Sequence, residues 1–335
     1  MKHHIPKLKT VFKKCLRYDW SYEEIKTTLD QPFFKLLYDA HSVHLEYNGE
    51  MTVQLSSLLN VKTGGCPEDC KYCSQSAHYK GKTKLEAKKL MDVETVLAEA
   101  KVARDNGADR FCIGAAWRKI PDTKEFDEIL EIIKGIKNLG LEACATLGML
   151  TKEQARKLAI AGLTAYNHNI DTSPEYYKNI TSTRTFSDRI STLNLVREAG
   201  IQVCCGGILG LGETKADRVE FLKVLANMKP HPESVPINIL VPISGTPFEN
   251  NSQVETLDLV RIIATARILM PSSRIRLSAG RKSLTEEAQI LCYFAGVNSI
   301  FYGDKLLTTN NNRQNEDTKL FQKLGLTPLN KQNIS

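Results

Sequence analysis

Residues 52–73 read TVQLSSLLNVKTGGCPEDCKYC, a β-rich run that leads through a glycine pair into a loop with three cysteines. Strands that alternate with helices predict a parallel sheet with right-handed crossovers. Eight such units predict an α/β fold of the (β/α)8 barrel type, in which the chemistry is built at the carboxyl ends of the strands. Seven further β-rich runs, each followed by a helical pattern, complete the eight units: 110–116, 141–147, 165–171, 202–209, 234–241, 274–279 and 299–302.

The barrel is expected to span residues 50–326. An N-terminal helical extension over 1–49 precedes it, and a C-terminal tail over 327–335 follows it. A doubly wound open sheet is the alternative, but no GxGxxG pattern follows the first β-rich run. A barrel is therefore the favoured architecture.

Helix boundaries are marked by capping residues between the runs. Asp92 can cap a helix that Asn106 and Gly107 end, and Thr151 with Gln154 resembles a capping box. The same signals predict helices over 187–200 and 285–296.

Composition favours one large globular domain, because 42% of the 335 residues are hydrophobic and 25% are charged. The sequence has neither a membrane-length apolar window nor a signal-peptide core, which predicts a cytoplasmic protein without a membrane partner. The net charge is +7, and six basic residues near the N-terminus account for most of it, so the rest of the chain is nearly neutral. We therefore expect a solvated basic tail and no nucleic-acid partner. A transit peptide is a weaker alternative for this short, serine-poor segment. Six basic residues precede the first acidic one, Asp19: Lys2, Lys7, Lys9, Lys13, Lys14 and Arg17.

The cysteine loop Cys66-x3-Cys70-x2-Cys73 is the strongest local signal for chemistry. Three thiolates on one short loop suit an iron-sulfur cluster that keeps one iron free of protein ligands. A structural zinc site is the alternative, with His78 as a fourth ligand, although such sites normally use paired C-x2-C ligands. Tyr72, between two of the cysteines, is either a shield of the cluster or a cofactor contact.

A second set of cysteines lies within the predicted strands. Side chains alternate between the two faces of a strand, so Cys204 shares a face with Gln202 and points inward, whereas Cys205 points to the surrounding helices. The same alternation places Asn167, Asn169 and Asp171 on one polar inner face of the fourth strand, and Arg276 on the inner face of the seventh. We therefore expect the inner cysteines and Arg276 to converge inside the barrel: Cys112, Cys144 and Cys204. The alternative for each single cysteine, including Cys15, Cys205 and Cys292, is that it is a small buried residue of the apolar core.

The cysteine loop after the first strand resembles the signature of the radical S-adenosylmethionine superfamily. Residues 206–213, GGILGLGE, resemble that superfamily's GxIxGxxE strand beside the adenine of the cofactor. The resemblance implies that Cys66, Cys70 and Cys73 hold a 4Fe-4S cluster, and that S-adenosylmethionine binds the fourth iron.

Over residues 53–326 the chain resembles the biotin synthase family. The resemblance implies a sulfurtransferase that catalyses the last step of biotin biosynthesis: S-adenosylmethionine is cleaved to a 5'-deoxyadenosyl radical, hydrogen is abstracted from dethiobiotin, and sulfur is inserted. It also implies that Cys112, Cys144, Cys204 and Arg276 hold a 2Fe-2S cluster, the sulfur donor. Segments that carry the resemblance are GGCPEDCKYCSQS, RFCIGAAW, GLEACATLG, YNHNIDTSPE, TRTFSDRI, GGILGLGET, ESVPIN, RLSAGR and NSIFYGDKLLTT.

The family resemblance also assigns contacts in the pocket. Asn169 and Asn238 would contact the ureido ring of dethiobiotin, which needs paired donors and acceptors. It further implies a flavodoxin- or ferredoxin-type reductant and a homodimer. Another radical S-adenosylmethionine enzyme and a non-catalytic metal or iron-sulfur scaffold are the alternatives. Contacts with S-adenosylmethionine would come from Tyr72, Asn169, Asp171, Arg189, Ile208 and Gly210.

Overall fold

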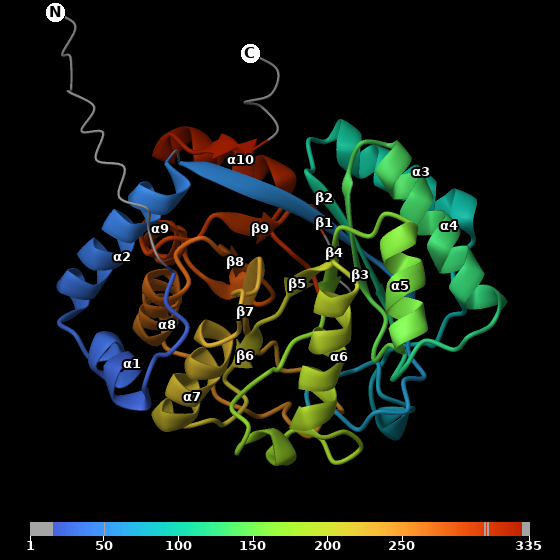
Figure 1. The fold of residues 1–335 in the computed structure, drawn as a ribbon, viewed down its shortest axis with the longest axis horizontal. Coiled ribbons are helices and arrows are strands. Elements are labelled where there is room, and N and C mark those ends of the chain that lie inside the picture. The colour runs from blue at the N-terminus through green and yellow to red at the C-terminus, as the bar shows by residue number, and fades with distance from the viewer. Residues whose placement is uncertain (1–15, 50, 305, 307, 330–335) are drawn as a thin grey trace, which may run out of the picture.

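Parallel strands close into a barrel in the computed structural model, which describes residues 16–49, 51–304, 306 and 308–329 (Figure 1). The described residues form ten strands in the order β10-β1-β2-β3-β4-β5-β7-β8-β9, with β6 also paired to β7, and a β1–β9 pairing closes the ring. The predicted (β/α)8 fold is confirmed. The strands are β1 (Thr52–Lys62), β2 (Arg110–Ala115), β3 (Glu142–Thr146), β4 (Ala165–Asn167), β5 (Gln202–Cys204), β6 (Gly207–Leu209), β7 (Ser234–Ile239), β8 (Arg274–Leu277), β9 (Ser299–Phe301) and β10 (Thr327–Pro328).

Helices surround the barrel (Figure 1), and their buried apolar residues share one core with the strands. As predicted, Asp92 accepts a hydrogen bond from the Thr95 amide, and Thr151 and Gln154 form a reciprocal capping box. The α-helices are α1 (Tyr22–Leu29), α2 (Phe33–Asn48), α3 (Val93–Asp105), α4 (Lys124–Asn138), α5 (Lys152–Ile160), α6 (Phe186–Glu198), α7 (Lys215–Ala226), α8 (Thr256–Leu269), α9 (Glu286–Phe294) and α10 (Gln314–Leu324). Short 3₁₀ turns lie at Ala77–Tyr79, Tyr177–Asn179 and Arg281–Ser283.

Several predicted strands end one or two residues from the observed ends, and three predicted boundaries differ in a way that matters for the site. The fourth strand ends at Asn167 and not at Asp171, because Asp171 has a positive φ of 65° that breaks the extended backbone. The predicted run 202–209 is divided into β5 and β6. The sixth helix begins under the cap of Thr185 and not at Ser187, since the Thr185 hydroxyl accepts the Asp188 amide.

The N-terminal extension packs beside the barrel, with α2 against α8 and α1 against α7 and α8. At the other end of the chain, Thr327 and Pro328 pair with Thr52 and Val53, so the first residues of the expected tail extend the sheet. Most of the basic segment, residues 1–15, and the tail residues 330–335 lie outside the described residues.

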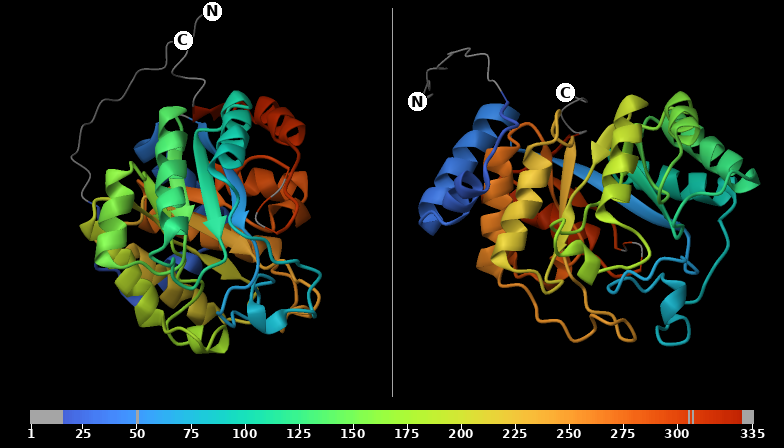
Figure 2. Two further views of the ribbon diagram at one scale, coloured as in Figure 1. Left: turned by 90° about the vertical axis from the view of Figure 1, so that its right-hand side faces the viewer. Right: turned by 60° about the horizontal axis from the view of Figure 1, so that its bottom comes forward.

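Long loops follow the carboxyl ends of the strands. Figure 2 shows the loop after β1 and the loop after β7 extending from the same end of the barrel. This is the end at which a (β/α)8 barrel places its chemistry.

None of the helices in the described part of the chain has the length and apolar character needed to span a bilayer.

Candidate active site

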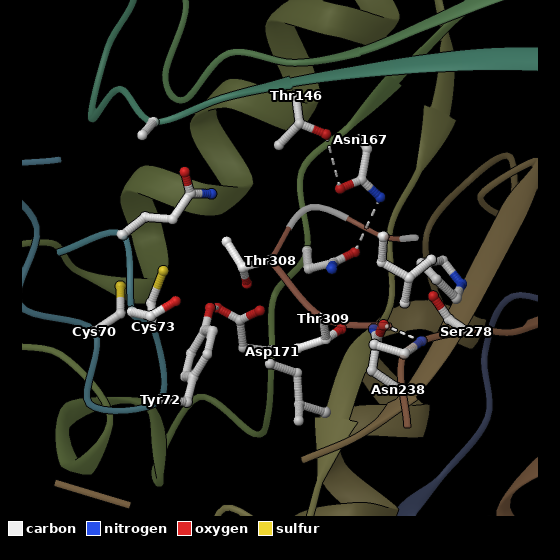
Figure 3. A pocket seen from close by; sticks show the side chains of 18 of the residues that line it. Cys70, Tyr72, Cys73, Thr146, Asn167, Asp171, Asn238, Ser278, Thr308 and Thr309 are labelled. Atoms are coloured by element: carbon white, nitrogen blue, oxygen red, sulfur yellow. Dashed lines mark hydrogen bonds between the residues drawn. The ribbon is translucent and has the colours of Figure 1, made fainter. Parts of the chain in front are cut away.

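A cavity of about 330 Å³ opens at the carboxyl ends of the strands (Figure 3). Its walls include the cysteine loop, the polar residues after β4, and the ends of β7 and β8. Most of the residues that the sequence marked for chemistry therefore share one pocket.

The cysteine loop is folded tightly against the mouth of the pocket. The Cys73 amide donates to the Cys70 carbonyl at 3.0 Å, and the Lys71 amide donates to the Ile180 carbonyl at 2.9 Å. Burial raises the pKa of Cys70 to about 11. Burial, and then the neighbouring Cys70, raise the pKa of Cys73 to about 12. Thiols whose pKa is raised in this way need a cationic partner to ionise at neutral pH, and a metal centre supplies one.

The loop fits an iron-sulfur cluster better than a single zinc ion. Four ligands at a Zn–S distance of about 2.3 Å lie within roughly 4 Å of one another. The described residues contain no group of three or more His, Cys, Asp or Glu side chains arranged to hold one ion. The proposed fourth zinc ligand, His78, instead contacts the Pro67 carbonyl through Nε2 at 3.2 Å. A cluster binds each thiolate to a different iron, which allows the wider spacing.

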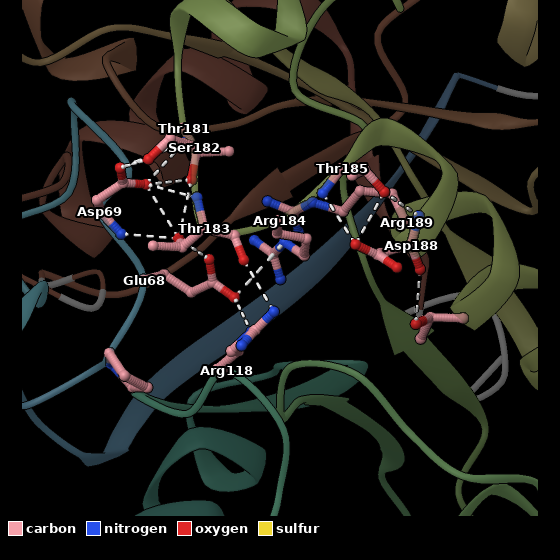
Figure 4. A network of polar contacts seen from close by, with 12 residues as sticks. Glu68, Asp69, Arg118, Thr181, Ser182, Thr183, Arg184, Thr185, Asp188 and Arg189 are labelled. Atoms are coloured by element: carbon pink, nitrogen blue, oxygen red, sulfur yellow. Dashed lines mark hydrogen bonds and ion pairs between the residues drawn. The ribbon is translucent and has the colours of Figure 1, made fainter.

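Two acidic residues inside the loop anchor it to the rest of the barrel (Figure 4). Asp69 accepts hydrogen bonds from the Ser182 amide at 2.9 Å and from the Thr181 hydroxyl at 2.5 Å. Glu68 is 3% exposed and forms an ion pair with Arg118 at 3.0 Å. Sequence reasoning missed these anchors, although two acidic residues between predicted cluster ligands are a signal for ionic anchoring.

Tyr72, Asp171 and Arg189 form a polar group behind the cysteines. Asp171 accepts hydrogen bonds from Arg189 Nη2 at 2.7 Å and from the Tyr72 hydroxyl at 3.2 Å. Arg189 also donates from Nε to the Tyr177 hydroxyl at 2.8 Å. The positive φ of Asp171 turns the chain at this point, and its carboxylate lies in the pocket (Figure 3). Such a cation–anion pair can bind the amino, carboxylate or hydroxyl groups of a ligand.

Two asparagines present amide groups to the pocket. Asn169 Oδ1 accepts the Gly206 amide at 3.1 Å, which leaves its NH₂ group facing the cavity. Asn238 donates to the Gly207 carbonyl at 2.9 Å and accepts the Ala279 amide at 3.2 Å. Backbone contacts therefore fix both side chains before any ligand binds.

The glycine-rich segment after β5 shapes one wall. A Cβ at Gly206 would lie 1.9 Å from the Pro236 carbonyl oxygen, so only glycine fits there. Ile208 lines the cavity, whereas Gly210 does not. Gly210 has φ +94°, and its amide donates to Glu213 at 3.0 Å, so it turns the chain beside the wall.

The second cysteine set lies deeper in the barrel. Cys112 and Cys144 face each other on paired strands and line the floor of the pocket. Cys204 is fully buried next to them, and a hydrogen bond from Cys144 lowers the pKa of Cys112. Cys205 packs in the main apolar core instead, as strand alternation predicted.

Arg276 is 1% exposed and points at this second set. Its Nη1 lies 3.9 Å from Cys204 Sγ, while Nε and Nη2 donate to the hydroxyls of Ser299 and Ser56 at 2.9 and 3.1 Å. It forms no ion pair with a carboxylate among the described residues. A buried guanidinium without a carboxylate suits a site whose thiolates supply the negative charge.

Sequence reasoning also missed part of the pocket wall that follows β9. Thr308 and Thr309 line the cavity (Figure 3). Their position after the last barrel strand is a usable signal, because loops after strands build barrel sites.

Comparisons with known proteins agree with this geometry. Residues 60–225 match the model of the Radical SAM superfamily, and residues 236–327 match the Biotin and Thiamin Synthesis associated domain. Solved structures with a similar fold include methylornithine synthase, with TM-score 0.78, 18% identity and coverage of 93% of this chain and 94% of that chain. The FeFe-hydrogenase maturase HydG from Carboxydothermus hydrogenoformans has TM-score 0.79 and 20% identity, with coverage of 92% and 76%.

Curated relatives are much more similar in sequence. Biotin synthase of Methylorubrum populi is 58% identical over 314 residues, which cover 94% of this chain and 92% of that protein. Biotin synthase of Legionella pneumophila (strain Paris) is 60% identical over 310 residues, with coverage of 92% and 98%. Identity at this level over nearly the whole of both chains shows that the chain belongs to the biotin synthase family.

Proposed function

We propose that this chain inserts sulfur into dethiobiotin to form biotin, as the names of its relatives indicate. The observation that carries the proposal is the position of two separate sets of cysteines along one pocket. Cys70 and Cys73 lie at its mouth, and Cys112 and Cys144 lie at its floor. A substrate in the cavity between them can meet a radical generator on one side and a sulfur donor on the other.

Each set of cysteines suits one cluster. Cys66, Cys70 and Cys73 would hold a 4Fe-4S cluster, and Cys112, Cys144, Cys204 and Arg276 would hold a 2Fe-2S cluster. When bound, these groups supply the one-electron cleavage of S-adenosylmethionine and the sulfur that closes the ring of biotin.

The remaining residues bind and orient. The Asp171–Arg189 pair would hold the polar groups of S-adenosylmethionine, with Tyr72 and Ile208 beside it. Gly210 would act by shaping the chain next to the cofactor and not by direct contact. The amides of Asn169 and Asn238 would contact the ureido ring, because backbone contacts already fix their orientation.

The alternatives differ in what they ask of the deeper cysteines. A different radical S-adenosylmethionine enzyme of this fold needs only the loop cysteines, and a scaffold protein needs no substrate pocket. The convergence of Cys112, Cys144, Cys204 and Arg276 beneath the cavity supports the sulfur-donor role.

An anaerobic assay with dethiobiotin, S-adenosylmethionine and a reductant tests the proposal. The 2Fe-2S cluster is reconstituted with ³⁴S-labelled sulfide, and the products are analysed by mass spectrometry. Labelled biotin together with 5'-deoxyadenosine is expected. Formation of 5'-deoxyadenosine without biotin would favour another radical enzyme, and the absence of both products would favour a scaffold.

The partners follow from the same proposal. An electron carrier of the flavodoxin or ferredoxin type would supply electrons in the cytoplasm. A homodimer is supported by an apolar stripe on α2, where Phe34, Tyr38 and Leu45 are 82%, 69% and 43% exposed. Sedimentation of the parent chain and of a Tyr38→Lys variant tests the dimer, and the variant should be monomeric.

A further inference from the structure

A second cavity, of about 350 Å³, lies at the amino-terminal ends of the strands, opposite the substrate pocket. Four of its walls are the first residues of β2, β3, β5 and β8: Arg110, Glu142, Gln202 and Arg274. Nothing in the proposed reaction uses these side chains.

The lining carries two arginines, Arg110 and Arg274, and two carboxylates, Glu142 and Glu233, but their pairing is incomplete. Arg110 forms an ion pair with Glu142 at 2.9 Å, but in the described part of the chain its Nη1 has no hydrogen-bond partner. Arg110 is only 2% exposed, so the unpaired group is costly without a ligand.

The second arginine is also incompletely paired. The Arg274 side chain makes no hydrogen bond or ion pair within the described residues. The other nearby carboxylate, Glu233, is already committed to Arg197 and to the Val203 amide. Among the described residues, both guanidiniums therefore keep N–H groups without a hydrogen-bond partner at the cavity.

The cavity lies directly below the deeper cysteine set. Each of the four lining residues lies two positions before a proposed 2Fe-2S ligand on the same strand. The lining residue and the ligand of each pair therefore both point into the barrel. Two residues along a strand span roughly 6.6 Å. The pairs are Arg110 with Cys112, Glu142 with Cys144, Gln202 with Cys204, and Arg274 with Arg276.

We propose that this cavity binds a small inorganic anion, and that hydrosulfide enters the 2Fe-2S site through it. The inference rests on the proposed function, because it assigns a supply side to the sulfur donor. Hydrosulfide already has the oxidation level of a bridging sulfide and loses one proton to water when it binds iron, so its entry transfers no electrons. A route from below replaces sulfur without crossing the pocket that holds substrate and cofactor.

Anion binding is tested on crystals of the full-length chain soaked in sodium bromide. An anomalous peak is expected between Arg110 and Arg274, and Arg274→Gln should abolish it. Arg274→Lys keeps the charge and should retain the peak. A control variant, Arg156→Gln, changes an arginine on the surface of α5 that pairs only with Glu153. The absence of bromide from the parent cavity overturns the anion site.

Delivery is tested by stripping the 2Fe-2S cluster and rebuilding it anaerobically with ferric iron and graded sodium sulfide, which together have the oxidation level of the visibly absorbing 2Fe-2S cluster. Arg274→Gln should need about tenfold more sulfide to reach half of the 2Fe-2S absorbance, since one charge-assisted contact is lost. The 4Fe-4S content is the internal control and should not change. Equal sulfide dependence in the parent and Arg274→Gln overturns the delivery role. A parent chain that never accepts a 2Fe-2S cluster contradicts the proposed function instead, while the bromide result still decides the anion site.

Discussion

Cys204 and Cys205 are adjacent in the chain and face opposite environments. Cys204 Sγ lies 3.2 Å from Asn167 Nδ2 and 3.9 Å from Arg276 Nη1, whereas Cys205 packs among apolar residues of the main core. We predict that Cys204→Ser loses the 2Fe-2S absorption and that Cys205→Ser keeps it. Cys205→Ser should lose about 1 kcal/mol of stability, because it buries a hydroxyl in an apolar site.

Visible absorbance and acid-labile sulfide of the two reconstituted variants give the measurement. The reverse pattern, with the cluster lost only in Cys205→Ser, would mean that β5 is shifted by one residue.

Arg276 differs from the cysteines in what its removal costs. Its hydrogen bonds go to the hydroxyls of Ser56 and Ser299, the Gln54 amide oxygen and the Cys204 thiol. It forms no ion pair with a carboxylate in the described chain, so Arg276→Met strands no buried acid. An iron can replace a lost nitrogen ligand by water more readily than it can replace a lost thiolate ligand. We predict that Arg276→Met keeps the 4Fe-4S cluster and still forms 5'-deoxyadenosine, while 2Fe-2S stability or biotin formation declines.

Thermal melts of this variant, with and without the 2Fe-2S cluster, separate the ligand role from a purely structural one. Equal destabilisation of both forms, with an unchanged 2Fe-2S spectrum, would remove Arg276 from the ligand set.

At the scale of elements, β4 and β5 show where sequence patterns stop being sufficient. The alternation of Asn167, Asn169 and Asp171 predicted one continuous strand, and all three side chains do line the pocket. The strand nevertheless ends at Asn167, because Asp171 turns with a positive φ to meet Arg189. The interaction that ends the strand comes from α6, and strand periodicity carries no information about it.

Helix α2 holds a buried histidine against α8 and gives a pH-dependent prediction. Burial, and then the charge of Arg267, lower the pKa of His44 from 6.5 to about 3. The folded state therefore keeps His44 neutral, while the unfolded state binds a proton below pH 6.5. The resulting loss of stability begins as the pH falls through 6.5 and grows until about pH 3, and it amounts to about 2 kcal/mol at pH 5.

Urea unfolding of His44→Gln at pH 7 and pH 5 measures this effect. The parent should lose about 2 kcal/mol more than the variant between the two pH values. His78→Gln, which changes a histidine on the exposed cysteine loop, should behave like the parent. A parent-like pH dependence in His44→Gln would show that another group is responsible.

For the whole molecule, the sequence predicted the barrel because each β-rich run is followed by a helical pattern, and several of these helices carry capping signals. It also predicted that Cys112, Cys144, Cys204 and Arg276 face one another, since strand alternation is a local property. The ion pair between Glu68 and Arg118 and the pocket wall at Thr308 depend on loops that meet only in the closed barrel. Such contacts between distant loops have no local periodicity, and sequence reasoning did not find them.

The loop cysteines and the strand cysteines lie at different levels of the barrel, and this separation leads to the last prediction. Replacing Cys66, Cys70 or Cys73 by Ala removes one ligand from the mouth of the pocket but leaves the deeper cysteines in place. Each variant should lose reductive cleavage of S-adenosylmethionine and retain the 2Fe-2S absorption. Cys292→Ala is the matched control, because Cys292 is buried in α9 and should leave both clusters intact. Methionine and 5'-deoxyadenosine are measured by chromatography beside the visible spectrum, and normal cleavage in any loop variant would exclude that cysteine from the cluster.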